Sequence, residues 1–81
     1  MVERLSGKKV IGIKQTSKSL KNGLGKVLYI AKDSDEHLIS PVIKLAENES
    51  VEVKYVDTMK ELGKLCGIDV GAAVALILKD S

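Results

Sequence analysis

The sequence has few of the residues that mark disulfide-bonded, disordered or single-strand-binding proteins. Cys66 is its only cysteine, so no disulfide within the chain can stabilise the fold. Pro41 is its only proline, so the proline-rich composition of many disordered chains is absent. It has no Trp or Phe, and Tyr29 and Tyr55 are its only tyrosines. Proteins that bind single-stranded nucleic acid stack bases on exposed aromatic rings, and this chain offers few such rings.

Long hydrophobic stretches are also missing. The longest uncharged apolar stretch covers residues 70–78, well short of the roughly 18 residues that suggest a membrane span. Residues 1–9 hold no apolar segment of signal-peptide length. We therefore expect a cytoplasmic protein without membrane association, since an unpaired cysteine is ordinary in the reducing cytosol.

The residues that are present predict one small folded domain. The chain has 81 residues, of which 44% are hydrophobic and 30% are charged, and this is the composition of a folded protein. A chain of this length has room for a single domain, which we place over residues 1–81. We expect it to be a monomer.

Charge is distributed unevenly along the chain. Residues 1–32 contain eight basic residues and one acidic residue, whereas residues 33–81 contain five basic and ten acidic residues. A basic half on a small domain is typical of a protein that contacts phosphates, although scattered lysines can also form an ordinary solvated surface. Because aromatic residues are so few, a nucleic-acid ligand would be recognised by its folded shape.

The pattern of apolar residues predicts alternating strands and helices. Gly23 and Gly67 are predicted to end the first and third helices, because glycine accepts the left-handed conformation that follows a helix. The alternating order is typical of a sheet with helices packed on both faces. The predicted strands cover residues 9–13, 26–31, 51–55 and 72–78, and the predicted helices follow the turns at residues 12, 33–36 and 58.

Local signals predict how two of the helices begin. Asp33, three residues before Glu36, matches the acidic relative of a capping box, and Thr58 with Glu61 forms a true capping box. The pair Ser40-Pro41 falls in the middle of the second helical stretch. Because serine can cap a helix and proline can occupy its first position, this pair predicts a kinked or two-part helix.

The chain lacks the residues that most enzymes need. His37 is the only histidine and has no cysteine near it in sequence, so a solvated helix residue is a better interpretation than a metal ligand. Cys66 lies beside an apolar helical stripe, which favours a structural thiol over a nucleophile. The run KNGLGK (residues 21–26) lacks the length and ending of a phosphate-binding loop. We expect no catalytic site, metal or cofactor.

Two segments remain that composition does not explain. The first is the helix start formed by Gly12, Ile13, Lys14 and Gln15, together with Lys18 one turn later. Backbone N–H groups at such a start can hold a phosphate or lie against base edges while lysines hold the backbone. The alternative is an ordinary surface helix.

The second segment is the connection formed by Ile68, Asp69, Val70 and Gly71. It has two β-branched apolar residues where connections usually have polar ones. A loop tucked into the core is the alternative to a binding loop, and the residues alone leave both interpretations open.

These segments resemble the ribosomal protein L-seven-Ae family, which includes the L-thirty-e proteins and the kink-turn-binding proteins of small nucleolar and spliceosomal particles. LGKLCGIDVGAAVALIL (residues 62–78) is close to the family's Leu-Gly-Lys, Gly-Ile-Glu-Val-Gly-Ala-Ala and apolar-strand pattern. GIKQTSKSLKNG (residues 12–23) matches the family's Gly-Thr-Asn-Glu-Val-Thr-Lys helix start at Gly12 and Lys18, and AKDSD (residues 31–35) matches its Ala-Glu-Asp-x-Asp turn. The small bacterial members are the most similar.

The resemblance implies a three-layer α/β/α sandwich around a four-stranded mixed sheet, in the α/β class. It also implies a ligand, the RNA kink-turn, which is a duplex sharply bent at a three-nucleotide bulge beside tandem sheared G·A pairs. The RNA would be ribosomal or a structured regulatory RNA such as a riboswitch.

The resemblance further implies roles for individual residues. Gly12 would let backbones approach closely, Lys14 and Gln15 would face the G·A pairs, and Lys18 would reach guanine or phosphate. The connection would pack over the bases flipped out of the bulge. The full set of expected RNA-binding residues is Gly12, Ile13, Lys14, Gln15, Lys18, Ile68, Asp69, Val70 and Gly71, with Lys8, Lys21 and Lys26 as candidate phosphate contacts.

Two other functions compete with this interpretation. Relatives with the same fold also bind proteins, so the chain can be a protein-interaction module without specific RNA binding. A small enzyme built around Cys66 is the second alternative. The basic half of the chain argues against the first, and the absence of partner residues for catalysis argues against the second.

Overall fold

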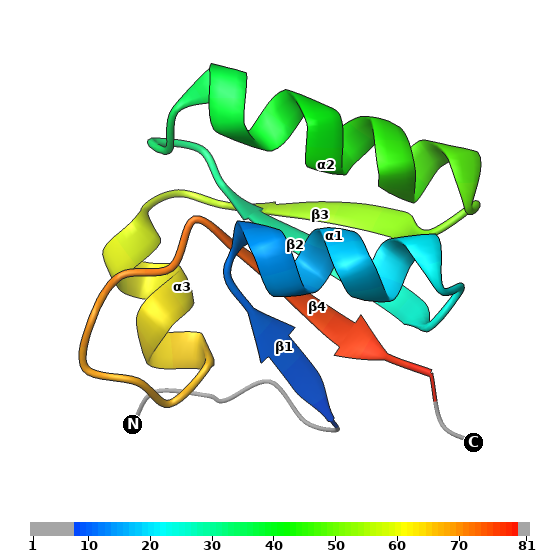
Figure 1. Cartoon of the computed structure of the whole chain (residues 1–81). Helices are drawn as coiled ribbons and strands as arrows, with labels where there is room; N and C mark the ends of the chain where they lie inside the picture. Colours follow the sequence, from blue (N-terminus) through cyan, green and yellow to red (C-terminus); the bar gives the residue numbers. More distant parts are fainter. Residues whose placement is uncertain (1–7, 80–81) are drawn as a thin grey trace.

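The computed structural model describes residues 8–79 and contains alternating strands and helices in the predicted order (Figure 1). Within these residues, four strands form one mixed sheet in the order β1-β4-β2-β3. Strand β4 is antiparallel to both β1 and β2, while β2 and β3 are parallel. The elements are β1 (Lys9–Ile11), α1 (Ile13–Lys21), β2 (Gly25–Ala31), α2 (Glu36–Asn48), β3 (Glu52–Val56), α3 (Met59–Leu65) and β4 (Val74–Leu78).

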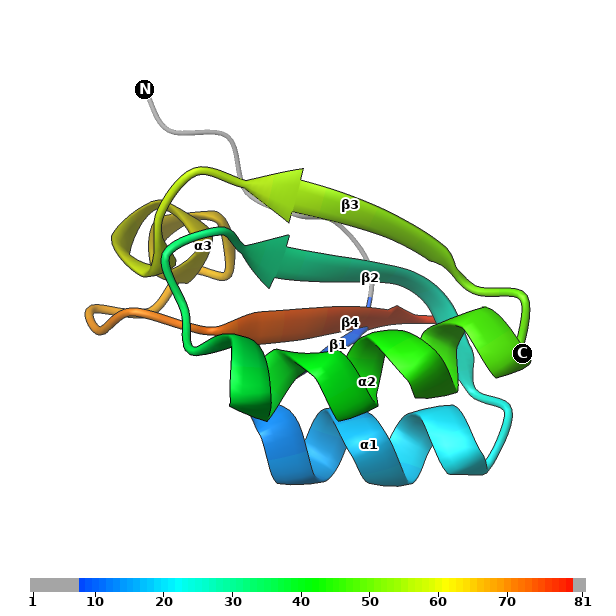
Figure 2. The ribbon, with the colours of Figure 1, turned by 90° about the horizontal axis from the view of Figure 1, so that it is seen from above.

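Helices cover both faces of the sheet, as a three-layer α/β/α sandwich requires (Figure 2). Helices α1 and α2 lie on one face, and α3 lies on the other. The two central strands, β2 and β4, are therefore buried on both sides, which explains their almost continuous apolar sequences. The predicted fold class is confirmed.

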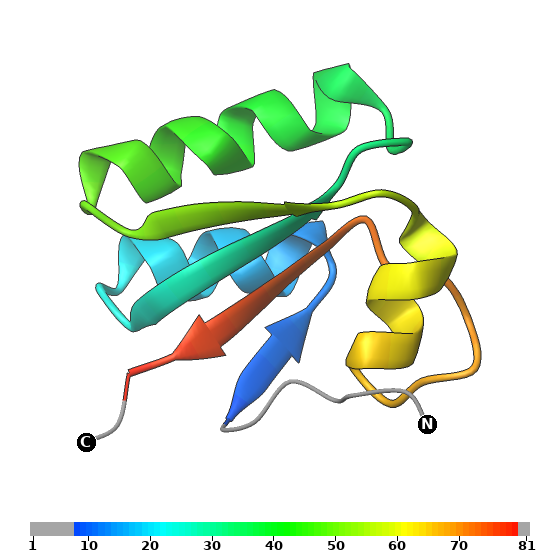
Figure 3. The same ribbon diagram turned by 180° about the vertical axis from the view of Figure 1, so that it is seen from behind.

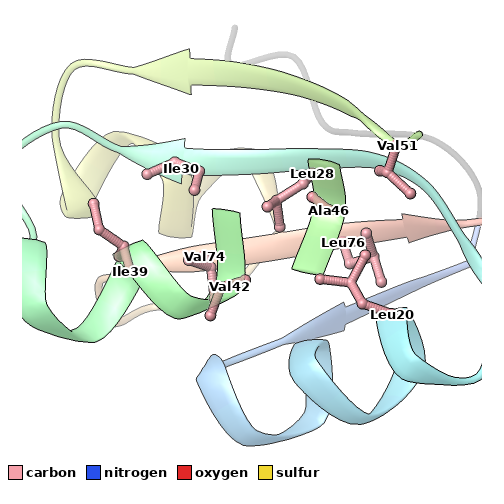
Figure 4. Packing of buried hydrophobic residues seen from close by; sticks show 9 residues of the cluster. All are labelled: Leu20, Leu28, Ile30, Ile39, Val42, Ala46, Val51, Val74 and Leu76. Carbon is pink, nitrogen blue, oxygen red and sulfur yellow. The ribbon is translucent and has the colours of Figure 1, made fainter. Parts of the chain in front are cut away.

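Successive side chains of the central strands point to opposite faces and so build two separate hydrophobic clusters. The larger cluster lies under α1 and α2 (Figure 4). Its buried members are Leu20, Leu28, Ile30, Ile39, Val42, Ala46, Val51, Val74 and Leu76. The smaller cluster lies under α3 and consists of Ala31, Leu62, Cys66, Ala72 and Ala75. Small alanines on this face let α3 pack close to the sheet.

Most of the predicted helix ends are confirmed. Gly23 and Gly67 follow α1 and α3 with φ angles of 71° and 77°, values that favour glycine. The hydroxyl of Thr58 accepts a hydrogen bond from the Glu61 N–H at 3.0 Å, as a capping box predicts.

Two local predictions for α2 are wrong. Asp35, not Asp33, caps this helix, and its carboxylate accepts a hydrogen bond from the His37 N–H at 2.8 Å. Asp33 instead binds the start of α3. Of the kinked or two-part helix predicted at Pro41, the two-part form is wrong, because α2 is one element from Glu36 to Asn48 with Pro41 inside it. Burial of Ile39, Val42 and Ala46 on both sides of the proline explains why the helix continues.

No helix in residues 8–79 is long and apolar enough to cross a membrane.

Candidate nucleic-acid interface

The start of α1 is an open helix N-terminus. Gly12 precedes the helix with a φ angle of 99°, a conformation that strongly favours glycine, and no side chain caps the helix there. Helix hydrogen bonding begins when the Thr16 N–H donates to the Gly12 carbonyl at 3.0 Å. The space that a side chain at Gly12 would fill has no atom within 4 Å. A ligand can therefore reach the first backbone N–H groups and the positive end of the helix dipole.

The exposed face of α1 is basic because its sequence is amphipathic. Thr16 and Leu20, four residues apart, are fully buried, which directs Lys14, Lys18 and Lys21 to solvent. The first turn contains no acidic residue. Gln15 is also exposed, whereas Ile13 is half-buried and packs against the larger cluster. The helix therefore presents lysines and an amide together, as predicted.

An open hollow of about 430 Å³ follows this face of α1. Sequence reasoning did not single out Ser17 and Asn22, although their spacing of four residues from Ile13 and Lys18 places them on the same face. The described residues that line the hollow are Ile13, Lys14, Ser17, Lys18, Lys21 and Asn22.

The connection between α3 and β4 divides its residues between core and surface. Ile68 is half-buried and packs against the smaller cluster. For this residue, the alternative of a loop packed into the core is partly correct. Asp69, Val70 and Gly71 are exposed. Val70 has 70% of its surface exposed, more than any other exposed large hydrophobic residue in the described part of the chain. Most of this aliphatic side chain is therefore accessible to an external partner.

The start of α1 and the strand start that follows the second predicted segment lie at the same edge of the sheet. The Gly12 N–H donates to the Val74 carbonyl at 3.2 Å, and the Ala31 N–H donates to the Ala73 carbonyl at 2.9 Å. The start of β4 is thus held between the start of α1 and the end of β2. From this point the α3–β4 connection extends along α3 (Figure 3).

The three candidate phosphate contacts are not part of this edge. Lys8 precedes β1, and its carbonyl accepts from the Leu78 N–H at 2.8 Å, at the far end of β4. Lys21 ends α1, and Lys26 lies at the start of β2. All three are exposed, but the length of α1, about 13 Å at 1.5 Å per residue, separates their end of the molecule from Gly12.

The other residues considered for chemistry have structural surroundings. His37 is exposed at the start of α2. Cys66 is 7% exposed in the smaller cluster. Burial raises the pKa of its thiol, and the positive charge of Lys9 opposes this effect by a smaller amount. Within residues 8–79, no group of three or more His, Cys, Asp or Glu side chains is arranged to hold a metal ion.

A four-stranded mixed sheet with helices on both faces, a basic helix start and an adjoining exposed loop together define a class of small α/β proteins. A sequence model of the ribosomal protein L7Ae/L30e/S12e/Gadd45 family matches residues 2–81, and the chain belongs to this family.

Individual relatives agree with this assignment. An RNA-binding protein of Caldanaerobacter subterraneus subsp. tengcongensis is 47% identical over 75 residues, which cover 93% of this chain and 92% of the relative. The large ribosomal subunit protein eL8 of Halobacterium salinarum is 32% identical over 95% of this chain and 65% of its own. The solved 15.5 kD RNA-binding protein of Giardia lamblia shares the fold, with a TM-score of 0.83 and 23% identity over 90% of this chain and 62% of its own.

Proposed function

We propose that this protein binds structured RNA and that it recognises the kink-turn. The observation that carries the proposal is the hydrogen bond from Gly12, at the exposed start of α1, to Val74, the first residue of β4 after the α3–β4 connection. Relatives similar over nearly the whole chain are named as RNA-binding proteins, and this supports the proposal.

The two segments have complementary properties for such a ligand. The start of α1 offers backbone donors, the ammonium groups of Lys14 and Lys18, and the amide of Gln15, all of which suit base edges and phosphates. Val70 offers an aliphatic surface that suits an unstacked base. A kink-turn presents polar base edges at its sheared G·A pairs and unstacked bases at the adjacent bulge. The base edges are accessible because the kink opens the otherwise narrow major groove.

The proposed mechanism is a shift in the conformational population of the RNA. An undistorted RNA duplex cannot place base edges against α1 and a flipped base against Val70 together. The protein therefore binds the kinked conformation more tightly and shifts the population of the RNA toward it. Neither step requires a cofactor. We place this activity in the cytoplasm, with a monomer binding ribosomal RNA or a riboswitch.

A titration at two salt concentrations tests the proposal. The protein is added to a labelled kink-turn duplex and to a matched duplex whose G·A pairs are replaced by Watson–Crick pairs. We expect tight binding to the first duplex alone, accompanied by bending seen as energy transfer between its ends. Equal, strongly salt-dependent binding to both duplexes would mean that the basic surface binds phosphates without recognising the kink. Absence of binding to either would favour a protein-interaction module.

A further inference from the structure

The connection between α3 and β4 lacks regular structure, yet both of its ends are hydrogen-bonded to α3. The Ile68 N–H donates to the Gly63 carbonyl at 3.0 Å, and the Ala72 N–H donates to the Met59 carbonyl at 3.0 Å. The intervening residues are the ones exposed at the proposed RNA surface. Helix α3 therefore fixes the two points between which this loop runs.

Gly63 provides a third point of contact between the ends. A Cβ atom at this position would overlap the Val70 carbonyl oxygen and would lie 3.0 Å from the Val70 carbonyl carbon and 3.2 Å from the Gly71 Cα. Gly63 is inside a helix and does not have a positive φ, so its own backbone conformation suits other residues, and alanine would favour the helix. The close approach of the loop is what accounts for glycine here.

Asp33 holds the helix residue to which the loop is attached. Its carboxylate accepts a hydrogen bond from the Met59 N–H at 2.8 Å, across 26 residues of sequence. The Met59 carbonyl is the group that accepts from Ala72, and a Cβ at Gly71 would lie 3.2 Å from the Met59 Cβ. The turn after β2 thus fixes the start of α3, and the start of α3 fixes the end of the loop.

We infer that Gly63 and Asp33 are positioning residues that hold the loop of residues 68–71, with Val70 exposed, in its RNA-binding conformation before any RNA arrives. Neither residue needs to touch RNA. The inference rests on the proposed function, because only there does the loop contact RNA. A loop that is already ordered loses less conformational entropy on binding, and this strengthens binding without adding a contact.

Gly63→Ala tests the close approach. Alanine improves the helix but displaces the Val70 carbonyl, so the protein should remain folded with an altered loop. In the RNA-free protein, the amide NMR signals of residues 68–72 should shift or broaden, while those of α1 should not. Affinity for the kink-turn should fall by roughly tenfold or more, because the preorganised surface is lost.

Gly25→Ala is the matched control. A Cβ at Gly25 would lie 3.0 Å from the side-chain ends of Leu20 and Leu76, so this substitution also disturbs packing, but at the opposite end of the sheet. This variant can lose stability, but its NMR signals for residues 68–72 and its preference for kinked RNA should be the same as in the parent.

Asp33 allows a second test with its own rescue. Asp33→Ala removes the acceptor for the Met59 N–H, whereas Asp33→Asn keeps an amide oxygen at that place. Asp33→Ala should increase amide hydrogen exchange in the loop and weaken kink-turn binding, and Asp33→Asn should restore both. An effect of the carboxylate charge alone would leave the two variants alike and would contradict the assignment of Asp33.

The two proposals fail in different ways. Unchanged loop signals and exchange in both Gly63→Ala and Asp33→Ala would overturn the positioning role, whatever the RNA result. A parent protein that does not prefer the kink-turn would overturn the proposed function, while the NMR signals of the free protein would still report whether α3 holds the loop. Altered loop signals with undiminished kink-turn affinity would show that preorganisation contributes nothing to binding and would also overturn the inference.

Discussion

Lys14 and Gln15 are exposed in the first turn of α1, beside the open N-terminus that Gly12 begins. Each can form a polar contact with a base edge, and a lost contact of this kind weakens specific binding by about 1–3 kcal/mol. We therefore expect Lys14→Ala and Gln15→Ala each to weaken kink-turn binding by about that amount. Titration of each variant with the kink-turn duplex and the Watson–Crick duplex measures the effect.

Lys44→Ala supplies the comparison for these two variants. Lys44 is exposed on α2, outside both proposed segments, so its loss changes the net charge without removing a proposed contact. It should retain the full preference for the kink-turn. Parent-like affinity in both Lys14→Ala and Gln15→Ala would show that the start of α1 does not contact the RNA.

The thiol of Cys66 links stability to pH. Because burial raises its pKa above the ordinary value of 9.0, the folded protein disfavours the thiolate relative to the unfolded chain. This contribution to stability is fully present below pH 9 and is lost as pH rises through the raised pKa of the folded state. Between pH 7 and pH 10, the parent should lose more of its free energy of unfolding than Cys66→Ala, which has no thiol.

Urea unfolding of both proteins at several pH values measures this difference. All other ionisable groups are common to the two proteins, so their effects cancel in the comparison. Parallel pH profiles for the parent and Cys66→Ala would mean that the folded and unfolded thiols share one pKa. At pH 7, kink-turn binding by Cys66→Ala should equal that of the parent, because the buried thiol is not among the proposed RNA contacts.

At the scale of whole elements, short-range signals predicted the fold well. Gly23, Gly67 and Thr58 act through bonds to residues three or four positions away, so the sequence around each contains nearly all the information needed. Asp35 caps α2, whereas Asp33 accepts a hydrogen bond from the Met59 N–H, which is 26 residues away and which the local sequence does not indicate. The same limit explains why the sequence indicated the start of α1 but not the contacts that Asp33 and Gly63 make across the chain.

Pro41 shows how packing overrides a local preference in α2. It occupies the sixth position of the helix, where its ring removes the N–H that would otherwise donate to the His37 carbonyl. Burial of the opposite face keeps the helix continuous. Because Pro41 is exposed, Pro41→Ala should restore the bond without disturbing the core and should raise the free energy of unfolding by about 1–2 kcal/mol.

Chemical denaturation of the parent and Pro41→Ala measures this gain, and Ser40→Ala, at the exposed neighbouring position, is the control for helix propensity alone. A gain in Pro41→Ala no larger than that in Ser40→Ala would mean that the proline costs the helix nothing. Affinity for RNA should be the same in all three proteins, because this face of α2 lies outside the proposed surface.

Over the whole molecule, the five lysines considered for RNA contact form two groups instead of one continuous site. Lys14 and Lys18 lie in the first two turns of α1, after the Gly12 that bonds to the start of β4, whereas Lys8, Lys21 and Lys26 lie toward the opposite end of the sheet. Lys21 still shares the hollow along α1 with the first group. This separation predicts different roles, with structure-specific contacts at one end and attraction of the phosphate backbone at the other.

Substitution of Lys8, Lys21 and Lys26 together by alanine tests the second role. Each lysine that contacts a phosphate releases about one counterion, so the slope of log affinity against log salt should become shallower by as much as about 3. Binding to the kink-turn and to the Watson–Crick duplex should weaken by the same factor, because backbone contacts carry no sequence information. The preference for the kink-turn should therefore be unchanged.

A second triple variant, in which Lys44, Lys54 and Lys64 become alanine, has the same net charge and separates contact from overall attraction. These lysines are exposed on α2, β3 and α3. If the first three lysines contact phosphates, only their loss should flatten the salt dependence. Equal flattening in both variants would mean that the RNA responds to the net charge of the molecule alone. A changed preference for the kink-turn in the first variant would instead place those lysines in the structure-specific site, despite their distance from Gly12.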